Sequence, residues 1–174
     1  MSQDEIKTLL TIRDADVYQK TKERRTDIQY HQRQAARAVV FDQNHHVAIL
    51  FVSKHGYYKL PGRGVDSGET VIEALHRECR EEIGCAIEVG KSIGKIIEYR
   101  DQEETRKENF CFVAMVVGEK GEPKFMEDEI EDGLQVLWVP FEKAKELIQH
   151  SSPKTYDGPF IIKRDLVFLE QMHI

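Results

Sequence analysis

The chain has 174 residues, of which 32% are charged and 40% are hydrophobic, and its formal net charge is −6. This length and composition predict one globular domain with a single core and argue against two full domains. The acidic balance argues against a nucleic-acid polymer as partner, and the longest apolar run, residues 110–117, is too short to cross a membrane.

Residues 1–30 carry charges throughout and contain no apolar segment of the kind found in signal peptides. We therefore expect an unexported, cytoplasmic protein. Cys79, Cys85 and Cys111 are odd in number and lack CxxC spacing, which argues against a disulfide framework and against a thiolate metal site. We expect reduced, partly buried thiols.

The first predicted elements precede a glycine-rich loop. Residues 1–34 are heavily charged and predict a short helix and a connecting arm, an N-terminal extension to a domain over residues 35–174. Two apolar, β-branched runs at 35–41 and 47–53 flank a turn-forming cluster and predict a β-hairpin. Residues 54–67 contain several glycines and a proline, which predict a long loop.

A helix is predicted after this loop. Thr70 and Glu73 have the spacing of a capping box. Leu75, Cys79 and Ile83 recur every four residues and form an apolar stripe that ends at a glycine. This stripe suits burial against a sheet.

The second half of the chain alternates between strands and helices. Strands are predicted over 86–89, 93–100, 109–117 and 134–140, helices over 141–150 and 159–172, and polar loops over 101–108 and 118–132. Strands interrupted by helices at irregular intervals predict an α/β fold with a mixed sheet covered by helices.

Three glutamates of the predicted helix lie beside its apolar stripe. At about 100° per residue, Glu78, Glu81 and Glu82 occupy an arc narrow enough to bind a common cation. Like charges at this spacing repel one another, whereas carboxylate oxygens are the ligands that hard divalent cations prefer. A solvated helix face is the alternative interpretation. A second acidic run, residues 127–132, allows the same two interpretations, a cation site or a solvated loop.

Two segments carry a resemblance to a known family. Residues 60–69 read LPGRGVDSGE and residues 77–85 read RECREEIGC. They resemble the Nudix box of the Nudix hydrolase superfamily, whose pattern is Gly, five residues, Glu, seven residues and then Arg-Glu-apolar-x-Glu-Glu-x-Gly-apolar. The match runs from Arg63 to Cys85 and departs from the pattern only at Arg63, which stands at the first glycine.

The resemblance implies a fold and an activity. The fold would be a Nudix-like α/β/α sandwich with a mixed β-sheet. The activity would be a metal-dependent hydrolysis in which water attacks phosphorus and splits a diphosphate linkage in a nucleoside diphosphate joined to a group X, with a nucleoside triphosphate as the first expectation. A non-catalytic module that senses nucleotides or ADP-ribose on the same fold is the alternative. In both cases the partner is a small-molecule nucleotide, and a homodimer wrapped by the N-terminal arm stays open.

The resemblance also implies a metal site. Glu78, Glu81 and Glu82 would bind Mg²⁺ or Mn²⁺, and the Gly62 carbonyl would be a further ligand. Glu78 is the first choice for the general base, although a base from a distant loop is the alternative.

Residues around the metal site receive supporting roles. Glu69 and Arg77 would form an ion pair that fixes the loop against the helix. The acidic run at 127–132 would supply one more metal-binding carboxylate, for which Glu131 is the first choice and Glu129 the second. No spacing rule singles out either residue, so the solvated-loop interpretation keeps equal weight.

Two further residues are candidates for substrate binding. Arg63 either clamps a phosphate or is a tolerated substitution, and it would be strained if its backbone needed a positive φ. Tyr58 precedes the loop and either stacks on a base or packs in the core.

Overall fold

The computed structural model describes residues 6–18 and 27–172. Its elements in chain order are β1 (Thr8–Arg13), α1 (Asp14–Val17), β2 (His31–Phe41), β3 (His46–Val52), β4 (Tyr57–Lys59), α2 (Val71–Ile83), β5 (Ala86–Arg100), β6 (Thr105–Val117), α3 (Glu127–Glu131), β7 (Leu134–Pro140), α4 (Phe141–Gln149) and α5 (Gly158–Glu170).

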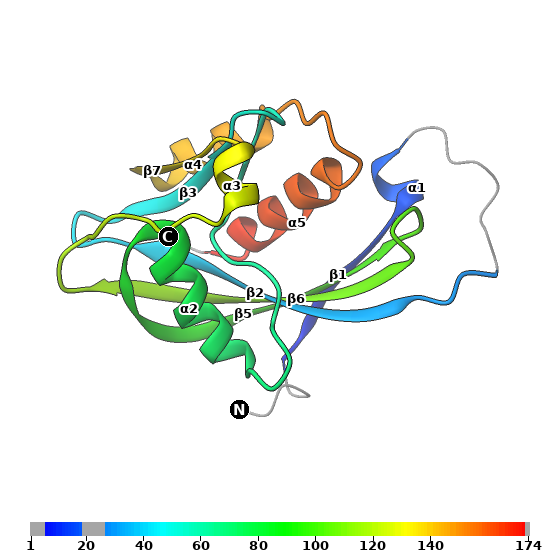
Figure 1. The fold of residues 1–174 in the computed structure, drawn as a ribbon, viewed down its shortest axis with the longest axis horizontal. Coiled ribbons are helices and arrows are strands. Elements are labelled where there is room, and N and C mark those ends of the chain that lie inside the picture. The colour runs from blue at the N-terminus through cyan, green and yellow to red at the C-terminus, as the bar shows by residue number, and fades with distance from the viewer. Residues whose placement is uncertain (1–5, 19–26, 173–174) are drawn as a thin grey trace.

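The strands form one mixed, seven-stranded sheet in the order β1-β5-β6-β2-β3-β4, with β7 paired to β3. Helix α2 covers one face, and α4 and α5 cover the other (Figure 1). One hydrophobic cluster lies beneath α2 and a second lies beneath α4 and α5. The predicted α/β sandwich with a mixed sheet is therefore confirmed.

The predicted helix α2 is present with its capping box. The Glu73 amide donates to the Thr70 hydroxyl at 3.2 Å, and the Thr70 amide donates to the Glu73 carboxylate at 2.8 Å. Leu75, Cys79 and Ile83 are at most 2% exposed, as the apolar stripe predicts. All three cysteines are unpaired and buried. Among the residues that the structure describes, no helix combines the length and apolar character needed to span a membrane.

The N-terminal segment differs from the prediction. Residues Thr8–Arg13 form strand β1, which pairs in parallel with β5, and helix is limited to Asp14–Val17. The strand contributes apolar side chains to the second cluster, in which Ile12 is fully buried and against which Leu9 and Leu10 pack. The expected helix over the start of the chain was therefore wrong for residues 8–13, while residues 1–5 and 19–26 lie outside the described part.

Four further elements differ from the prediction. Strand β5 is continuous through a bulged region between Val89 and Gly94, where a break between two strands was expected. The second half of the expected loop at 101–108 is strand, because β6 begins at Thr105. Neither β4 nor α3 was predicted, since each is too short for a hydrophobic pattern to repeat in the sequence.

The loop before α2 runs along the edge of β2. Strands β2 and β3 pair only at Phe41 and Val47, so most of this edge of β2 has no strand beside it. Loop carbonyls accept from β2 amides there: Pro61 from Ala38 at 3.2 Å and Arg63 from Ala36 at 3.0 Å. The loop therefore has the fixed backbone of an irregular strand.

Gly62 is the tightest point of this loop. Its φ is 120°, and a Cβ at this position would lie 2.0 Å from the Ala36 carbonyl oxygen. By contrast, a Cβ at Gly64 would have no neighbour nearer than 4.0 Å. Only a residue without a side chain fits at position 62.

We predict that Gly62→Ala lowers the free energy of unfolding by about 3 kcal/mol or more, because it adds a steric overlap to an unfavourable φ. The matched control Gly64→Ala should change it by less than about 1 kcal/mol. Urea denaturation followed by circular dichroism measures both. Equal losses of unfolding free energy in the two variants would contradict the claim that the close contact between Gly62 and the Ala36 carbonyl of β2 requires glycine at position 62.

Candidate active site

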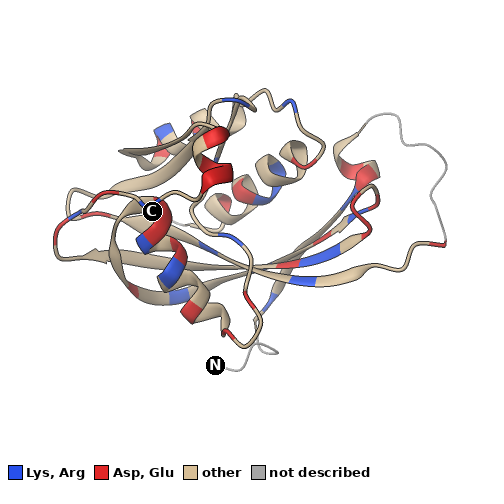
Figure 2. Ribbon diagram, in the orientation of Figure 1, with Lys and Arg blue, Asp and Glu red and all other residues tan. Residues whose placement is uncertain are grey.

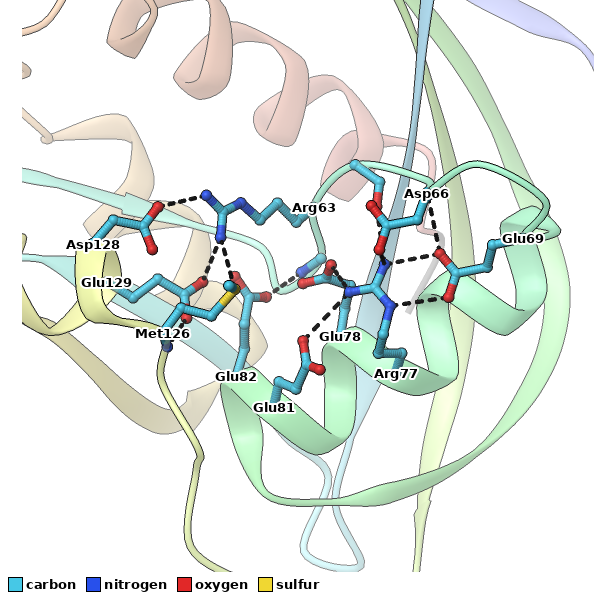
Figure 3. Close-up of polar contacts among 12 residues, drawn as sticks. Arg63, Asp66, Glu69, Arg77, Glu78, Glu81, Glu82, Met126, Asp128 and Glu129 are labelled. Carbon is cyan, nitrogen blue, oxygen red and sulfur yellow. Dashed lines mark hydrogen bonds and ion pairs between the residues drawn. The ribbon is translucent and has the colours of Figure 1, made fainter.

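The three glutamates of α2 differ in exposure. Glu82 is fully buried and Glu78 is 2% exposed, while the Glu81 side chain is 36% exposed. Figure 3 shows all three side chains directed to the side of α2 that faces the glycine-rich loop. The helix therefore places two carboxylates beneath the loop and one at its margin.

Glu82 has a partner on each carboxylate oxygen. The Gly62 amide donates to Oε2, and the Lys59 ammonium lies 2.9 Å from Oε1. Because Glu82 is at 0% exposure, these two groups replace its water. Glu82 therefore connects α2 to β4 through Lys59 and to the glycine-rich loop through Gly62.

Arg77 organises the other carboxylates. It binds Glu69 through two parallel hydrogen bonds, from Nε to Oε1 at 2.9 Å and from Nη2 to Oε2 at 2.8 Å. The predicted ion pair is therefore present, and it holds the pKa of Glu69 below its usual value. The same guanidinium contacts Glu78, Glu81 at 3.3 Å and the Gly64 carbonyl at 3.2 Å. One side chain thus links loop and helix.

Burial and neighbouring charge act together on Glu78. Desolvation and then the nearby Glu82 carboxylate raise the pKa of Glu78 to about 7, against the lowering effect of Arg77. The two buried carboxylates repel each other, although Arg77 and Lys59 lie beside them.

The acidic run at 127–132 contains the short helix α3. Glu129 is 7% exposed, and its pKa is raised by burial and by the charge of Glu82. Glu131 is exposed, because positions two apart in a helix differ by about 200° in direction. The structure thus brings Glu129 to the glutamates of α2, and it leaves Glu131, our first choice, facing away from them.

Arg63 extends from the loop toward α3, where it pairs with Asp128 and lies 3.7 Å from Glu129 (Figure 3). Its backbone is unstrained, because the positive φ falls on Gly62. Figure 2 shows acidic residues on both α2 and α3, so Arg63 lies within a negatively charged region. Its contacts are with these two carboxylates and with the Met126 sulfur at 3.5 Å.

Tyr58 lies on the other side of the sheet. Its ring stacks on Phe51 with centroids 4.5 Å apart, and it packs against the cluster beneath α4 and α5. Its neighbour Lys59 points the opposite way, to Glu82, as alternation along a strand requires. Tyr58 is therefore not brought together with the glutamates.

Comparison with known proteins gives the family. The model of the NUDIX domain matches residues 31–157. The chain belongs to the NUDIX family. Members of this family are Nudix-type hydrolases, which act on small-molecule nucleotides. A search of curated proteins found no match.

Solved structures share the Nudix fold at low sequence identity. A NUDIX hydrolase from Nitrosomonas europaea has a TM-score of 0.60 at 17% identity, over 82% of this chain and 89% of that one. A MutT protein from Methanosarcina mazei has a TM-score of 0.55 at 19% identity, over 79% and 95%. An ADP-ribose pyrophosphatase from Streptococcus suis has a TM-score of 0.52 at 16% identity, over 82% and 92%. These likenesses support the fold.

The donor set of this Nudix site fits a divalent cation. No three acidic, histidine or cysteine side chains converge as a metal site among the described residues. The buried Glu78 and Glu82 nevertheless repel each other, and the Glu82 charge also disfavours the ionised form of Glu129. Carboxylate oxygens are hard ligands, and an added cation would remove this repulsion. Glu78, Glu81, Glu82 and Glu129 are the residues that could hold it.

A groove lies next to this Nudix site. Its volume is about 510 Å³, and it is bounded by residues 32–34 of β2, residues 65–69 of the loop, and Arg106 and Glu108 of β6. Glu69, which pairs with Arg77, contributes to its wall. The groove therefore reaches the ion pair that supports the glutamates.

We predict that Lys59→Met destabilises the protein by about 3 kcal/mol in chelator, because it leaves the buried Glu82 carboxylate without its cation. Adding Glu82→Gln to this variant should recover most of the loss. The matched control is Lys54→Met, which breaks a pair with Asp132 of the same 2.9 Å length but with a lysine side chain that is 53% exposed. The control should cost much less in the same urea denaturation, because water already solvates the exposed Lys54 ammonium. A small effect at both lysines would contradict the assigned role of Lys59.

Proposed function

We propose that this Nudix-family protein is a hydrolase that requires Mg²⁺ or Mn²⁺ and cleaves a diphosphate linkage in a nucleoside diphosphate joined to a group X. The observation that carries the proposal is the pair of buried, mutually repelling carboxylates on α2, Glu78 and Glu82, beneath a glycine-rich loop. Such an arrangement costs stability in the free protein and is explained by binding of a cation. A nucleoside triphosphate is our first choice of substrate.

We assign the following metal-binding roles. Glu78, Glu81 and Glu82 hold the ion, the Gly62 carbonyl is a further ligand, and Glu129 completes the set in place of Glu131. A bound divalent cation supplies charge neutralisation and a lowered pKa for attacking water.

The remaining roles concern the proton and the phosphates. Glu78 is our choice for the general base, because it is 2% exposed and its position is fixed by a hydrogen bond from Arg77. Arg77 positions Glu78 and Glu81 and is itself oriented by Glu69. Arg63 remains a candidate for a phosphate contact, since its guanidinium could exchange the exposed Asp128 for substrate. The neighbouring groove could hold part of group X.

A panel of diphosphate compounds tests this function. Nucleoside triphosphates, ADP-ribose, other nucleotide sugars and dinucleoside polyphosphates would each be incubated with Mg²⁺ and with Mn²⁺, and the nucleotide products would be separated by chromatography. Metal-dependent cleavage of one class confirms the hydrolase. Tight binding of a nucleotide without any cleavage would favour the alternative, a nucleotide-sensing module.

We predict that Glu82→Gln lowers metal-dependent turnover by about 100-fold or more, because it removes a charged ligand from the ion. The fold should persist, because glutamine can still accept a hydrogen bond from the Gly62 amide. Initial rates and far-ultraviolet circular dichroism provide the two measurements. Near-normal turnover by a folded variant would refute the metal assignment.

The two glutamates of α3 provide a matched pair. Glu129→Gln should reduce turnover about tenfold or more, because this residue lies beside Glu82, whereas the exposed Glu131→Gln should leave turnover within about twofold of wild type. The comparison is made at saturating Mg²⁺ and again across a Mg²⁺ titration. A larger loss of turnover in Glu131→Gln than in Glu129→Gln would show that Glu131, not Glu129, is the metal-binding carboxylate of α3.

A further inference from the structure

One oxygen of the buried Glu82 carboxylate is bound by a lysine side chain. Lys59, the last residue of β4, places its ammonium 2.9 Å from Glu82 Oε1, and its side chain is 14% exposed. The other oxygen, Oε2, accepts a hydrogen bond from the Gly62 amide. Within the described part of the chain, the Lys59 ammonium forms no salt bridge with any other carboxylate. Lys59 is therefore the counter-ion of Glu82 alone.

The two partners of Glu82 differ in their freedom to move. The Gly62 amide belongs to a backbone that is bonded to β2 through the carbonyls of Pro61 and Arg63, so it can leave Oε2 only if the loop leaves the sheet. The Lys59 ammonium is carried by a flexible aliphatic stem and already has some contact with water. Oε1 is thus the Glu82 oxygen whose partner can be exchanged.

The Lys59 ammonium lies close to two acidic residues of the site. Besides its contact with Glu82, its charge acts on Glu129 of α3. Burial raises the pKa of Glu129, the charge of Glu82 adds to this rise, and the charge of Lys59 opposes it. One positive charge therefore serves two of the carboxylates to which we assign the divalent ion.

Other cationic groups near Glu82 do not replace Lys59. Arg77 and Arg63 form their salt bridges with other carboxylates. Arg37 acts on Glu82 through its charge, without a salt bridge. Among the residues that the structure describes, Lys59 is the one cationic side chain in direct contact with Glu82.

We propose that Lys59 competes with the divalent ion for Glu82. Its ammonium binds Oε1 when the site holds no ion and withdraws toward water when an ion binds, so this lysine sets how tightly the site holds the ion. The exchange keeps a positive charge beside the buried carboxylate in both states, which avoids an unpaired buried charge. The proposal rests on the proposed function, which places the ion at the glutamates of α2, and it concerns a residue outside the Nudix box.

The first test measures Mn²⁺ affinity by isothermal titration calorimetry, without substrate or turnover. Lys59→Met should bind Mn²⁺ at least about tenfold more tightly than wild type, because the ion no longer displaces an ammonium. Lys59→Arg keeps the charge and should bind Mn²⁺ no more tightly than wild type. The matched control Lys54→Met removes a lysine whose side chain is 53% exposed and which pairs with Asp132, and it should change the affinity by less than about twofold.

The second test separates competition from a purely structural pair. Unfolding by urea is measured for wild type and Lys59→Met, each in chelator and in saturating Mn²⁺. Because an ion that binds only the folded protein stabilises it according to its affinity, a tenfold tighter affinity restores about 1.4 kcal/mol of the loss that Lys59→Met shows in chelator. A structural pair that persists beside the ion would leave the loss unchanged. If Lys59→Met is unfolded in chelator, Mn²⁺ should fold it, and circular dichroism across a Mn²⁺ titration then reports the affinity.

Several results would overturn the proposal. They are wild-type protein that binds no Mn²⁺, equal or weaker Mn²⁺ binding by Lys59→Met, an equal gain in Lys59→Met and Lys54→Met, and Lys59→Met that stays unfolded in saturating Mn²⁺. Failure of the proposed function gives a different result. In that case no diphosphate of the panel is cleaved, although Lys59→Met still binds Mn²⁺ more tightly than wild type. Conversely, metal-dependent cleavage with equal Mn²⁺ affinities would leave the function standing and remove the competition.

Discussion

The site depends on one short piece of backbone that is held from both sides of the sheet. The Leu60 amide donates to Asp165 of α5 at 2.8 Å, and two residues later the Gly62 amide donates to Glu82 of α2. Both carboxylates are fully buried, so each hydrogen bond forms without competition from water. Between them the loop is bonded to β2, and it can approach β2 closely only because residue 62 has no side chain. Helix α2, the sheet and α5 therefore fix the same segment.

This arrangement also explains how clustered acids remain in a folded protein. Arg77 and Lys59 place cationic groups next to Glu78 and Glu82, so the free protein carries fewer unpaired negative charges than its sequence indicates. The net charge of −6 first indicated only that a nucleic-acid polymer is an unsuitable partner. The structure shows that acidic residues of α3 pair with Arg63 of the loop, so part of this acidity is neutralised within the protein.

The sequence predicted the parts of the site that depend on local spacing. The cap at Thr70, the apolar stripe of α2 and the pairing of Glu69 with Arg77 all follow from residues within one loop and one helix. The sandwich and its mixed sheet followed from the family resemblance and the pattern of strands. Strand β1 was missed, because its pairing with β5 joins segments some ninety residues apart and leaves a weak alternation in the sequence.

The positions of Lys59, Glu129 and Asp165 in the site and the burial of Arg37 could not be predicted, because each depends on contacts between distant segments. Glu129 could have been preferred over Glu131 only if residues 127–131 were known to be helical, since the helix decides which of the two is buried. Arg37 left a single signal, a charged residue within an apolar strand. That signal fits an edge position equally well, and only the burial in the structure distinguishes the two.

Arg63, the one departure from the Nudix box, has a physical explanation in the same loop. The positive φ of the turn is confined to Gly62, and the Arg63 carbonyl is bonded to β2, so the backbone does not require glycine at position 63. The side chain is then free to extend outward, and it pairs with Asp128 of α3. Arginine thereby links the loop that carries Gly62 to the helix that carries Glu129. Because exposed pairs of this kind exchange partners at little cost, the pair with Asp128 is compatible with the phosphate contact that the proposed function assigns to Arg63.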